Sequence, residues 1–542
     1  MEGPVAATET TPGAVGDDLA TPQVVSEEVR DFVRAHEQRR RQLPRAILVG
    51  MGSGLTAVAF SRALGAGDQL RTELIVAAHA HPGWGVLVPI VLAALGAAVA
   101  VSLVQWIAPE ASGSGIPHLK AVVHHLRPMR WARVLGVKFV GGVVGIGAGL
   151  TLGREGPTIQ MGGAIGQMVG GWFRCSPRER QTLITAGAGA GLAAAFNAPL
   201  AGLVFVLEEV QRDFAPTVFT ATLVAAVIAD VVTRLLSGQL PVFHIETHAA
   251  PPLLSLPVSL ALGLLAGVLG VAFNRALVGA LDLFQRMRRS PWLAGALAGA
   301  VVGGAGWFVP DALGGGHRLV ERTLAGHLEL LPIAGFFVLR FALTMVSYGS
   351  GAPGGIFAPL LVLGSELGLG VGLVSQWVLP GAVEHPETFA VVGMAAYFTA
   401  IVRAPLTGIV LIVEMTGDYS LVLSLLVACL TAYGVADLLG DRPVYEALLE
   451  RDLLRGQESP TLPGNLLLEL TVAPGAPFEG RQVRDLGLPA GCVLVTIRRN
   501  LREEVPTAAS SIEAGDRITA VVGPEAVGAV ALLRRGTAAP RG

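Results

Sequence analysis

Long apolar stretches follow one another along most of the chain, with little polar sequence between them. Four of these stretches, residues 83–107, 251–273, 291–310 and 419–436, contain no charged side chain. A helix of about 20 apolar residues spans the hydrocarbon core of a membrane, so each stretch is long enough or nearly long enough to cross. At roughly 20 to 25 residues per crossing, residues 46 to 440 have room for on the order of 15 helices, some crossing only in part. The pattern predicts a polytopic, all-α membrane protein.

The two ends of the chain depart from this pattern. Residues 1–45 are polar and carry Arg39, Arg40 and Arg41 just before the first apolar stretch, which places the amino terminus in the cytoplasm by the positive-inside rule. Basic loops at 127–133, 174–180 and 286–289 are candidates for the same side. No apolar core follows the first methionine, so we expect no cleavable signal peptide.

Near the carboxy terminus, short β-rich runs at 466–472, 492–497 and 518–522 alternate with turn residues and predict a small soluble α/β module. We therefore divide the chain into an amino-terminal segment (1–45), a membrane domain (46–449), a linker (450–464) and a carboxy-terminal domain (465–542).

Composition excludes several functional classes. Of the 542 residues 52% are hydrophobic and only 15% are charged, against roughly 25% charged in soluble chains. The net charge of -2 leaves no basic surplus for nucleic acid. Cys175, Cys429 and Cys492 are far apart, which excludes a disulfide framework and a thiolate metal site. We expect no enzyme activity, no cofactor and no metal, and the 70 glycines indicate helices packed closely through small residues.

Three sequence elements recur in the same order in the two parts of the membrane domain. Residues 197–209 align without gaps on residues 403–415, sharing Ala, Pro, Leu, Gly, Val and a Glu. A G-x-x-x-P element occurs at 153–157 and at 355–359, and a G-S-G-x-P element at 113–117 and at 349–353. An ordered set of this kind predicts two related halves of inverted topology, with the transport path between them.

The Gly and Pro residues of these elements predict broken helices. Irregular backbone at membrane depth is tolerated only where it lines a cavity or is buried in protein. Pro suits the first turn of a helix, so Pro117, Pro157 and Pro359 each indicate a helix amino terminus with unpaired backbone N–H groups. Several such termini, meeting near the middle of the membrane, would bind a small anion without the full positive charge that would trap it.

Carboxylates in this apolar sequence are candidates for proton exchange, because an ionisable group within a membrane is costly unless it is paired or functional. Glu155 stands beside one expected anion-binding terminus and could occupy the anion's place when ionised and leave it when protonated. Glu208 and Glu414 match across the repeat, and for them a salt bridge or a helix-end hydrogen bond is the favoured interpretation. Glu209 has no counterpart in the second half.

Together with Tyr445, the elements Gly113-Ser114-Gly115-Ile116-Pro117, Gly153-Arg154-Glu155-Gly156-Pro157 and Gly355-Ile356-Phe357-Ala358-Pro359 resemble the CLC family of chloride channels and chloride/proton antiporters. The resemblance covers residues 46–449. It implies the CLC fold of broken and re-entrant helices and a homodimer in a bacterial inner membrane, with both termini cytoplasmic and one anion path in each subunit.

The resemblance also implies roles for individual residues. The hydroxyls of Ser114 and Tyr445 and the backbone N–H groups of Ile356 and Phe357, next to Gly113 and Gly355, would hold the central anion. Glu155 would be the external gate, and Glu209 the internal proton-transfer glutamate that favours an antiporter over a passive gated channel. Ser114, where some relatives carry Pro, favours chloride over nitrate, and the intact motifs disfavour fluoride. His118 and Lys120 replace acidic residues frequent in the family, with Lys138 nearby, which alters the inner charge balance.

The tail resembles a TrkA-C domain rather than paired CBS domains, on the strands and turns of residues 466–523. Such domains usually dimerise and can bind small ligands, so both a cytoplasmic regulator and a module that only stabilises a dimer remain open. The favoured function is chloride/proton antiport. The alternatives are a passive gated chloride channel and a membrane sensor that acts through its tail, against which the intact anion motifs argue.

Overall fold

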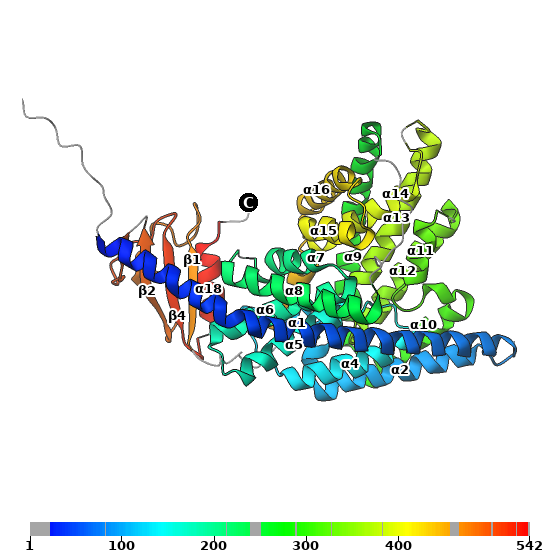
Figure 1. Cartoon of the computed structure of the whole chain (residues 1–542), viewed down its shortest axis with the longest axis horizontal. Helices are drawn as coiled ribbons and strands as arrows, with labels where there is room; N and C mark the ends of the chain where they lie inside the picture. Colours follow the sequence, from blue (N-terminus) through cyan, green and yellow to red (C-terminus); the bar gives the residue numbers. More distant parts are fainter. Residues whose placement is uncertain are drawn as a thin grey trace, which may run out of the picture.

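A computed structural model describes residues 22–81, 83–212, 214–238, 251–287, 290–326, 328–381, 383–455, 465–499, 502–526 and 528–539. Residues 1–21 of the expected amino-terminal segment, residues 288–289 of a basic loop and residues 456–464 of the expected linker lie outside this description. The described chain is mostly helical, and seven of its helices are long and apolar enough to cross a membrane. Figure 1 shows these helices as one elongated body, with the carboxy-terminal domain at one end.

The described residues of the first half form eight α-helices and one π-helical turn. Helix α1 runs through Pro44 without a break, so the polar segment before residue 45 and the first apolar stretch share one helix. The elements are α1 (Pro22–His79), α2 (Leu87–Ile107), α3 (Ile116–Val123), α4 (Trp131–Gly147), α5 (Glu155–Trp172), α6 (Pro177–Phe196), α7 (Pro199–Phe205), η2 (Val206–Gln211) and α8 (Pro216–Ser237).

The second half repeats this alternation of long and short helices. The short helices α7 and α15 begin at the prolines of the sequence repeat, Pro199 and Pro405, and pack on one another. The elements are α9 (Leu256–Gln285), α10 (Pro291–Phe308), α11 (His317–Leu324), α12 (Leu330–Gly349), α13 (Phe357–Val378), α14 (Glu387–Val402), α15 (Pro405–Thr416), α16 (Val422–Leu438) and α17 (Val444–Arg455).

Small residues set the spacing between the helices, as the glycine content predicts. Where α5 crosses α6, a Cβ built on Gly162 would lie 2.1 Å from the backbone oxygen of Gly187. Where α2 crosses α10, a Cβ on Gly299 would lie 2.1 Å from the oxygen of Ala93. Lipid supplies no hydrophobic drive between helices, so close van der Waals packing of this kind holds them together.

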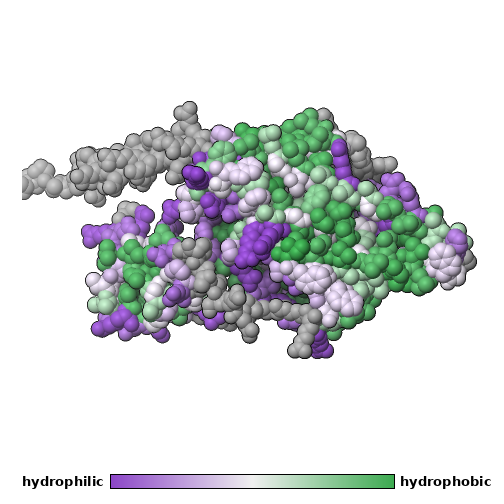
Figure 2. Space-filling model, turned by 90° about the horizontal axis from the view of Figure 1, so that it is seen from below, coloured by the Kyte–Doolittle hydropathy of each residue, from purple (hydrophilic) through white to green (hydrophobic). Residues whose placement is uncertain are grey.

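The outer surface of the helical body is apolar. Trp106, Phe308 and Trp377 are 72%, 80% and 86% exposed, as expected for side chains that face lipid rather than water. Figure 2 shows mostly apolar surface over the helical body, with hydrophilic residues on the carboxy-terminal domain and in patches on the body.

The carboxy-terminal domain is a four-stranded antiparallel sheet in the order β1-β4-β2-β3 with helix α18 (Gly528–Thr537). The three predicted strands are present as β1 (Leu466–Thr471), β2 (Cys492–Arg499) and β4 (Arg517–Val522), and β3 (Arg502–Glu504) is a short addition. Leu126, which follows α3, packs against the apolar core of this domain. The domain therefore contacts the membrane domain just beyond the carboxy-terminal end of α3.

A bidentate ion pair links the end of β2 to the residue just before β4. The Arg499 guanidinium donates to both carboxylate oxygens of Asp516 at 2.8 Å, and the Glu513 backbone N–H donates to the same carboxylate at 2.7 Å. Burial alone would raise the pKa of Asp516, but the hydrogen bonds from Arg499 and Glu513 outweigh it and hold the pKa below its ordinary value. The stabilisation is therefore present above the ordinary pKa of aspartate and is lost as the pH falls through the lowered pKa.

We expect Asp516→Asn to destabilise the carboxy-terminal domain by about 2 kcal/mol at neutral pH, because it removes a charge-assisted pair. Hydrogen exchange of the β2 and β4 amides in the purified full-length protein measures this effect. The difference from the unmodified protein should shrink in acid, and Glu513→Gln, at a more exposed carboxylate, should cost less. Equal protection of Asp516→Asn and the unmodified protein at neutral pH would contradict the account.

Candidate functional site

The matching elements of the two halves meet in an antiparallel backbone bridge. The N–H of Gly153 donates to the oxygen of Gly355 at 2.7 Å, and the N–H of Gly355 donates to the oxygen of Gly153 at 2.8 Å. Gly113 joins the same junction, because its N–H donates to the oxygen of Ala352 at 3.2 Å and its oxygen accepts from the N–H of Gly354 at 3.0 Å. The three predicted breaks therefore lie together, with no side chain at the bridging positions.

Three helices begin at this junction, at the positions that the sequence predicts. Helix α3 begins at Ile116, α5 at Glu155 and α13 at Phe357. Gly115, which caps α3, has φ 78°, a left-handed conformation that favours glycine. The first-turn N–H groups have no partner within their own helices, and they carry the positive ends of the helix dipoles. The junction therefore offers neutral donors to an anion.

The Glu155 side chain reaches from the first half onto a helix end of the second half. It is completely buried, and its Oε2 accepts a hydrogen bond from the backbone N–H of Ala358, in the first turn of α13, at 3.3 Å. The Nε of Arg154 lies 3.9 Å from the other oxygen, Oε1. In this conformation the carboxylate lies at the amino terminus of α13, where the helix dipole favours a negative charge.

The other residues expected at the anion are also completely buried around this junction. Ser114, Ile356, Phe357 and Tyr445 are all 0% exposed. The Ser114 Oγ accepts from the N–H of Ile116 at 3.3 Å, so its own proton is available to a further acceptor. The Tyr445 hydroxyl has no hydrogen-bond partner among the described residues. A buried hydroxyl donor without a partner is costly unless another group accepts its proton.

One residue of this junction was missed by the sequence analysis. The hydroxyl of Tyr348 accepts the backbone N–H of Ser114 at 3.4 Å, and it lies 2.8 Å from where a Cβ on Gly113 would stand. Tyr348 directly precedes the second copy of the G-S-G-x-P element. Its place beside the repeat is the signal that could have identified it.

Aromatic rings surround the first residue of α13. The ring of Phe357 lies 4.5 Å from that of Phe398, 5.4 Å from that of Phe196 and 6.3 Å from that of Phe205, measured between centroids. These side chains exclude water from the helix end. Electrostatic interactions with the N–H donors are stronger in such a low-dielectric environment.

The repeated glutamates Glu208 and Glu414 bond to helix ends, as expected. Glu208 accepts from the backbone N–H groups of Leu406 and Thr407, at 3.1 and 2.7 Å. Glu414 accepts from those of Leu200 and Ala201, at 3.0 and 2.7 Å. Each carboxylate caps the short helix of the opposite half, so this symmetric pair fastens the two halves together.

Glu209 lies in the π-helical turn η2 and is buried, whereas the neighbouring Glu208 is half-buried. Glu209 is 1% exposed, and its Oε1 accepts from the Nζ of Lys120 at 2.6 Å.

Lys138 is not part of this pair; it is completely buried and donates to the oxygens of Ala111 and Gly113, at 2.9 and 2.7 Å. His118 contacts the side chain of Gln160 at 3.2 Å. Lys120 therefore contacts a predicted site residue directly, whereas Lys138 supports the backbone before Ser114.

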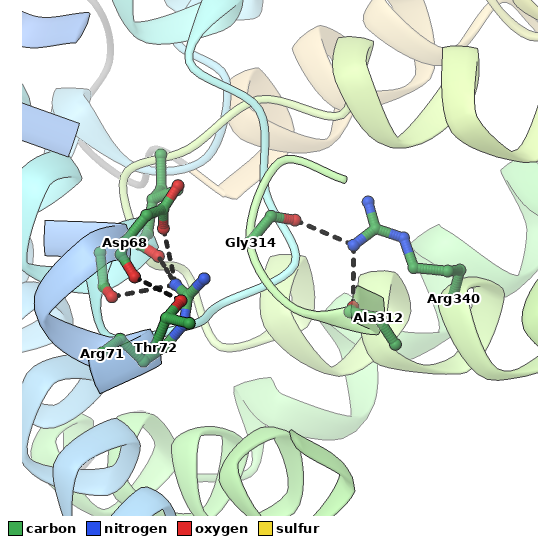
Figure 3. Close-up of polar contacts among 8 residues, drawn as sticks. Asp68, Arg71, Thr72, Ala312, Gly314 and Arg340 are labelled. Carbon is green, nitrogen blue, oxygen red and sulfur yellow. Dashed lines mark hydrogen bonds and ion pairs between the residues drawn. The ribbon is translucent and has the colours of Figure 1, made fainter. Parts of the chain in front are cut away.

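Two buried arginines hold loop backbone in place: Arg71 at the end of α4, which leads toward Glu155, and Arg340 at the turn between α10 and α11 (Figure 3). Arg71 of α1 donates to the oxygen of Gly147, at the end of α4, at 3.0 Å and to Asp68 at 2.7 Å. Arg340 of α12 donates to the oxygens of Ala312 and Gly314, at 2.8 and 2.9 Å. Sequence analysis missed both. The signal for Arg340 is a lone charge within the otherwise uncharged helix α12.

A cavity of about 680 Å³ reaches the junction from the side of the basic loop 127–133. Its lining includes Gly113, Gly115 and Tyr348 at the inner end and Arg127, Arg130 and Arg451 further out. The lining also includes Glu110 and Asp452, so its arginines leave a small positive excess, which favours anions. The described residues contain no cluster of His, Cys, Asp and Glu that could hold a metal ion.

The chain matches known proteins over both domains. The family model for voltage gated chloride channels matches residues 95–437, and that for the TrkA-C domain matches residues 467–533. The H(+)/Cl(-) exchange transporter ClcA of Vibrio parahaemolyticus is 40% identical over 450 residues, 81% of this chain and 96% of the relative. ClcA of Salmonella paratyphi B is 40% identical over 447 residues, 80% of this chain and 94% of the relative.

Solved structures agree with these matches. A slow cyanobacterial Cl-/H+ antiporter superposes with a TM-score of 0.74 at 38% identity, covering 77% of this chain and 99% of the other. A eukaryotic CLC transporter superposes with a TM-score of 0.64 at 23% identity, covering 78% of this chain and 77% of the other, and supports the fold alone. The sequence, the junction of broken helices and these matches together show that the chain is a multi-pass membrane protein of the CLC family with a TrkA-C domain at its carboxy terminus.

Proposed function

We propose that this protein exchanges chloride for protons across the membrane. The observation that carries the proposal is the bond from the Ala358 N–H to the carboxylate of Glu155. A carboxylate and a chloride ion cannot occupy the same helix end, so chloride binding there requires Glu155 to leave. Protonation removes the charge that holds Glu155 in place, and this links proton uptake to anion occupancy. Relatives at 40% identity that are named H(+)/Cl(-) exchange transporters support the same function.

The anion-binding part of the mechanism uses neutral donors. The N–H groups of Ile356 and Phe357 and the hydroxyls of Ser114 and Tyr445 surround the central position, next to the backbone of Gly113 and Gly355. Such donors replace the hydration shell of chloride without a formal positive charge, so the ion can both bind and leave. The arginine-lined cavity supplies anions from the side of the loop 127–133. Ser114 donates its hydroxyl to a spherical halide, which favours chloride over nitrate.

The proton-transfer part of the mechanism uses two carboxylates. Glu209 takes up protons from the inner side, and Glu155 exchanges them with the outer side when it leaves the helix end. Both are completely or almost completely buried in the described structure, so neither can exchange protons directly with bulk water without rearrangement. Anion and proton therefore share the junction and use different routes on the inner side.

We further propose the cellular arrangement. Two subunits, each with its own path, form a homodimer in the lipid of a bacterial inner membrane, with both termini in the cytoplasm; the CLC membership and the basic loops support this.

The TrkA-C domain binds a small molecule and regulates transport. The packing of Leu126 against the core of that domain supports a contact through which regulation could reach α3.

The first test uses the purified protein in liposomes with high internal chloride, no pH difference and the membrane potential clamped at zero. Chloride efflux should drive protons into the liposomes, although no proton gradient is present at the start. Glu155→Ala should keep chloride efflux but lose proton movement, because the competing carboxylate is gone. Chloride efflux without proton movement in the unmodified protein would instead establish a passive channel. Coupled proton uptake by Glu155→Ala would remove Glu155 from the role of gate.

The second test separates the two carboxylates. Glu209→Gln should carry chloride at a rate near that of the unmodified protein but should no longer move protons, because the amide cannot accept a proton and the anion donors are untouched. Glu208→Gln is the matched control, since the neighbouring carboxylate caps α15 and should affect stability rather than coupling. Unchanged proton transport by Glu209→Gln would exclude it from the proton route.

A further inference from the structure

Lys120 stands against Glu209 in a buried ion pair. Its Nζ lies 2.6 Å from Oε1 of Glu209, and the two side chains are 4% and 1% exposed. The pair joins two elements, because Lys120 belongs to α3 and Glu209 to the π-helical turn η2. Helix α3 also follows Ser114 directly, so one short helix connects the expected anion site with the expected proton-transfer carboxylate.

The second oxygen of Glu209 is also held by a cation, but more loosely. The Arg212 guanidinium lies 3.4 Å from Oε2, is 44% exposed and forms a further ion pair with Glu446 of α17. Water screens an exposed pair of this kind far more than a buried one. Lys120 is therefore the dominant partner of Glu209.

The remaining charged and titratable groups around Glu209 are few. Tyr445 of α17 lies within electrostatic range of Glu209. His124, at the end of α3, lies within range of Arg534 of α18, Lys120 and Arg212. Helix α7, which packs on η2, contains no titratable residue, and those of α6 are confined to its first turn, Arg178 to Arg180. Among the charged groups of the described residues, Lys120 is thus the main partner of Glu209.

A proton-transfer group in this setting faces a specific obstacle. Protonation of Glu209 would leave the Lys120 ammonium buried without a counter-charge, and removing one partner of a buried ion pair is strongly unfavourable. Proton uptake therefore requires Lys120 to move away from Glu209 or the pair to gain water. Because Lys120 is carried by α3, such a movement also involves the helix that begins at the anion site.

We propose that Lys120 is a positioning residue that holds Glu209 ionised and oriented, and that release of this pair controls the inner proton step of the exchange. The inference rests on the proposed function and concerns the same site. Within the described part of the chain, Lys120 forms no hydrogen bond or ion pair with the expected anion donors or with Glu155, so it acts on transport through Glu209.

The test compares Lys120→Met, Lys120→Arg and Arg212→Met in liposomes, with chloride-driven proton transport recorded over a series of equal internal and external pH values. Loss of the buried cation makes proton uptake easier, so Lys120→Met should move the pH of half-maximal proton transport upward by about 1 unit or more. Lys120→Arg keeps the charge and should keep the profile of the unmodified protein. Arg212→Met should shift it less, because Arg212 is more exposed and shared with Glu446.

Two further comparisons address a variant that fails to assemble and an effect of Lys120 on chloride transport. Lys120→Gln removes the charge but keeps a hydrogen-bond donor, and it should give the same shift. It replaces Lys120→Met in the comparison if that variant fails to assemble. The rate of chloride efflux is also compared between Glu155→Ala and Glu155→Ala/Lys120→Met. The two rates should be equal if Lys120 acts only on the proton route.

An unshifted pH profile in both Lys120→Met and Lys120→Gln would overturn the proposal, and so would a changed chloride efflux in the double variant. Failure of the exchange function itself would look different, since the unmodified protein would then move no protons in response to chloride.

Discussion

Backbone N–H groups at broken helix ends within the membrane are the constraint on which this structure depends. Lipid cannot satisfy them, so protein or a bound ion must. The two halves meet this need in part by bonding to each other, through the bridge of Gly153 and Gly355 and through Glu208 and Glu414, each of which caps a helix of the opposite half. In the described structure the first turn of α13 holds the carboxylate of Glu155. Under the proposed function an anion takes that place when Glu155 leaves, and exchange follows from this competition between two negative groups at one helix end.

The charges around this junction are placed so that few of them touch the anion position directly. Lys138, Arg71 and Arg340 donate to backbone oxygens and thereby hold the loops that form the site. Lys120 neutralises Glu209 instead. Cations that support the backbone keep the loops in place, and the neutral donors remain free to bind and release an ion. The same arrangement explains how a membrane domain can bury several lysines and arginines, because each has a carbonyl or carboxylate partner.

The sequence predicts the helical class, the three strands of the tail and the starts of α3, α5 and α13, because Gly and Pro act locally on the backbone. It also separates Glu209 from Glu208 and Glu414, because only the latter two repeat. It does not predict that Lys120 pairs with Glu209, that Arg340 holds the turn at Ala312 and Gly314, or that Leu126 packs on the tail domain. Those contacts join residues 26 to several hundred positions apart, and their geometry depends on how the halves pack. A lone charge in apolar sequence signals that a partner exists without identifying it.

The central claim is that the Glu155 carboxylate and an anion compete for the amino terminus of α13. The most direct measurement is anomalous diffraction from crystals grown in bromide, for the unmodified protein and for Glu155→Gln. The account predicts a bromide peak among Ser114, Tyr445 and the N–H groups of Ile356 and Phe357 in both proteins. It predicts a second peak, near the Ala358 N–H, only in Glu155→Gln. Identical peaks in the two proteins, or none at this junction, would contradict it.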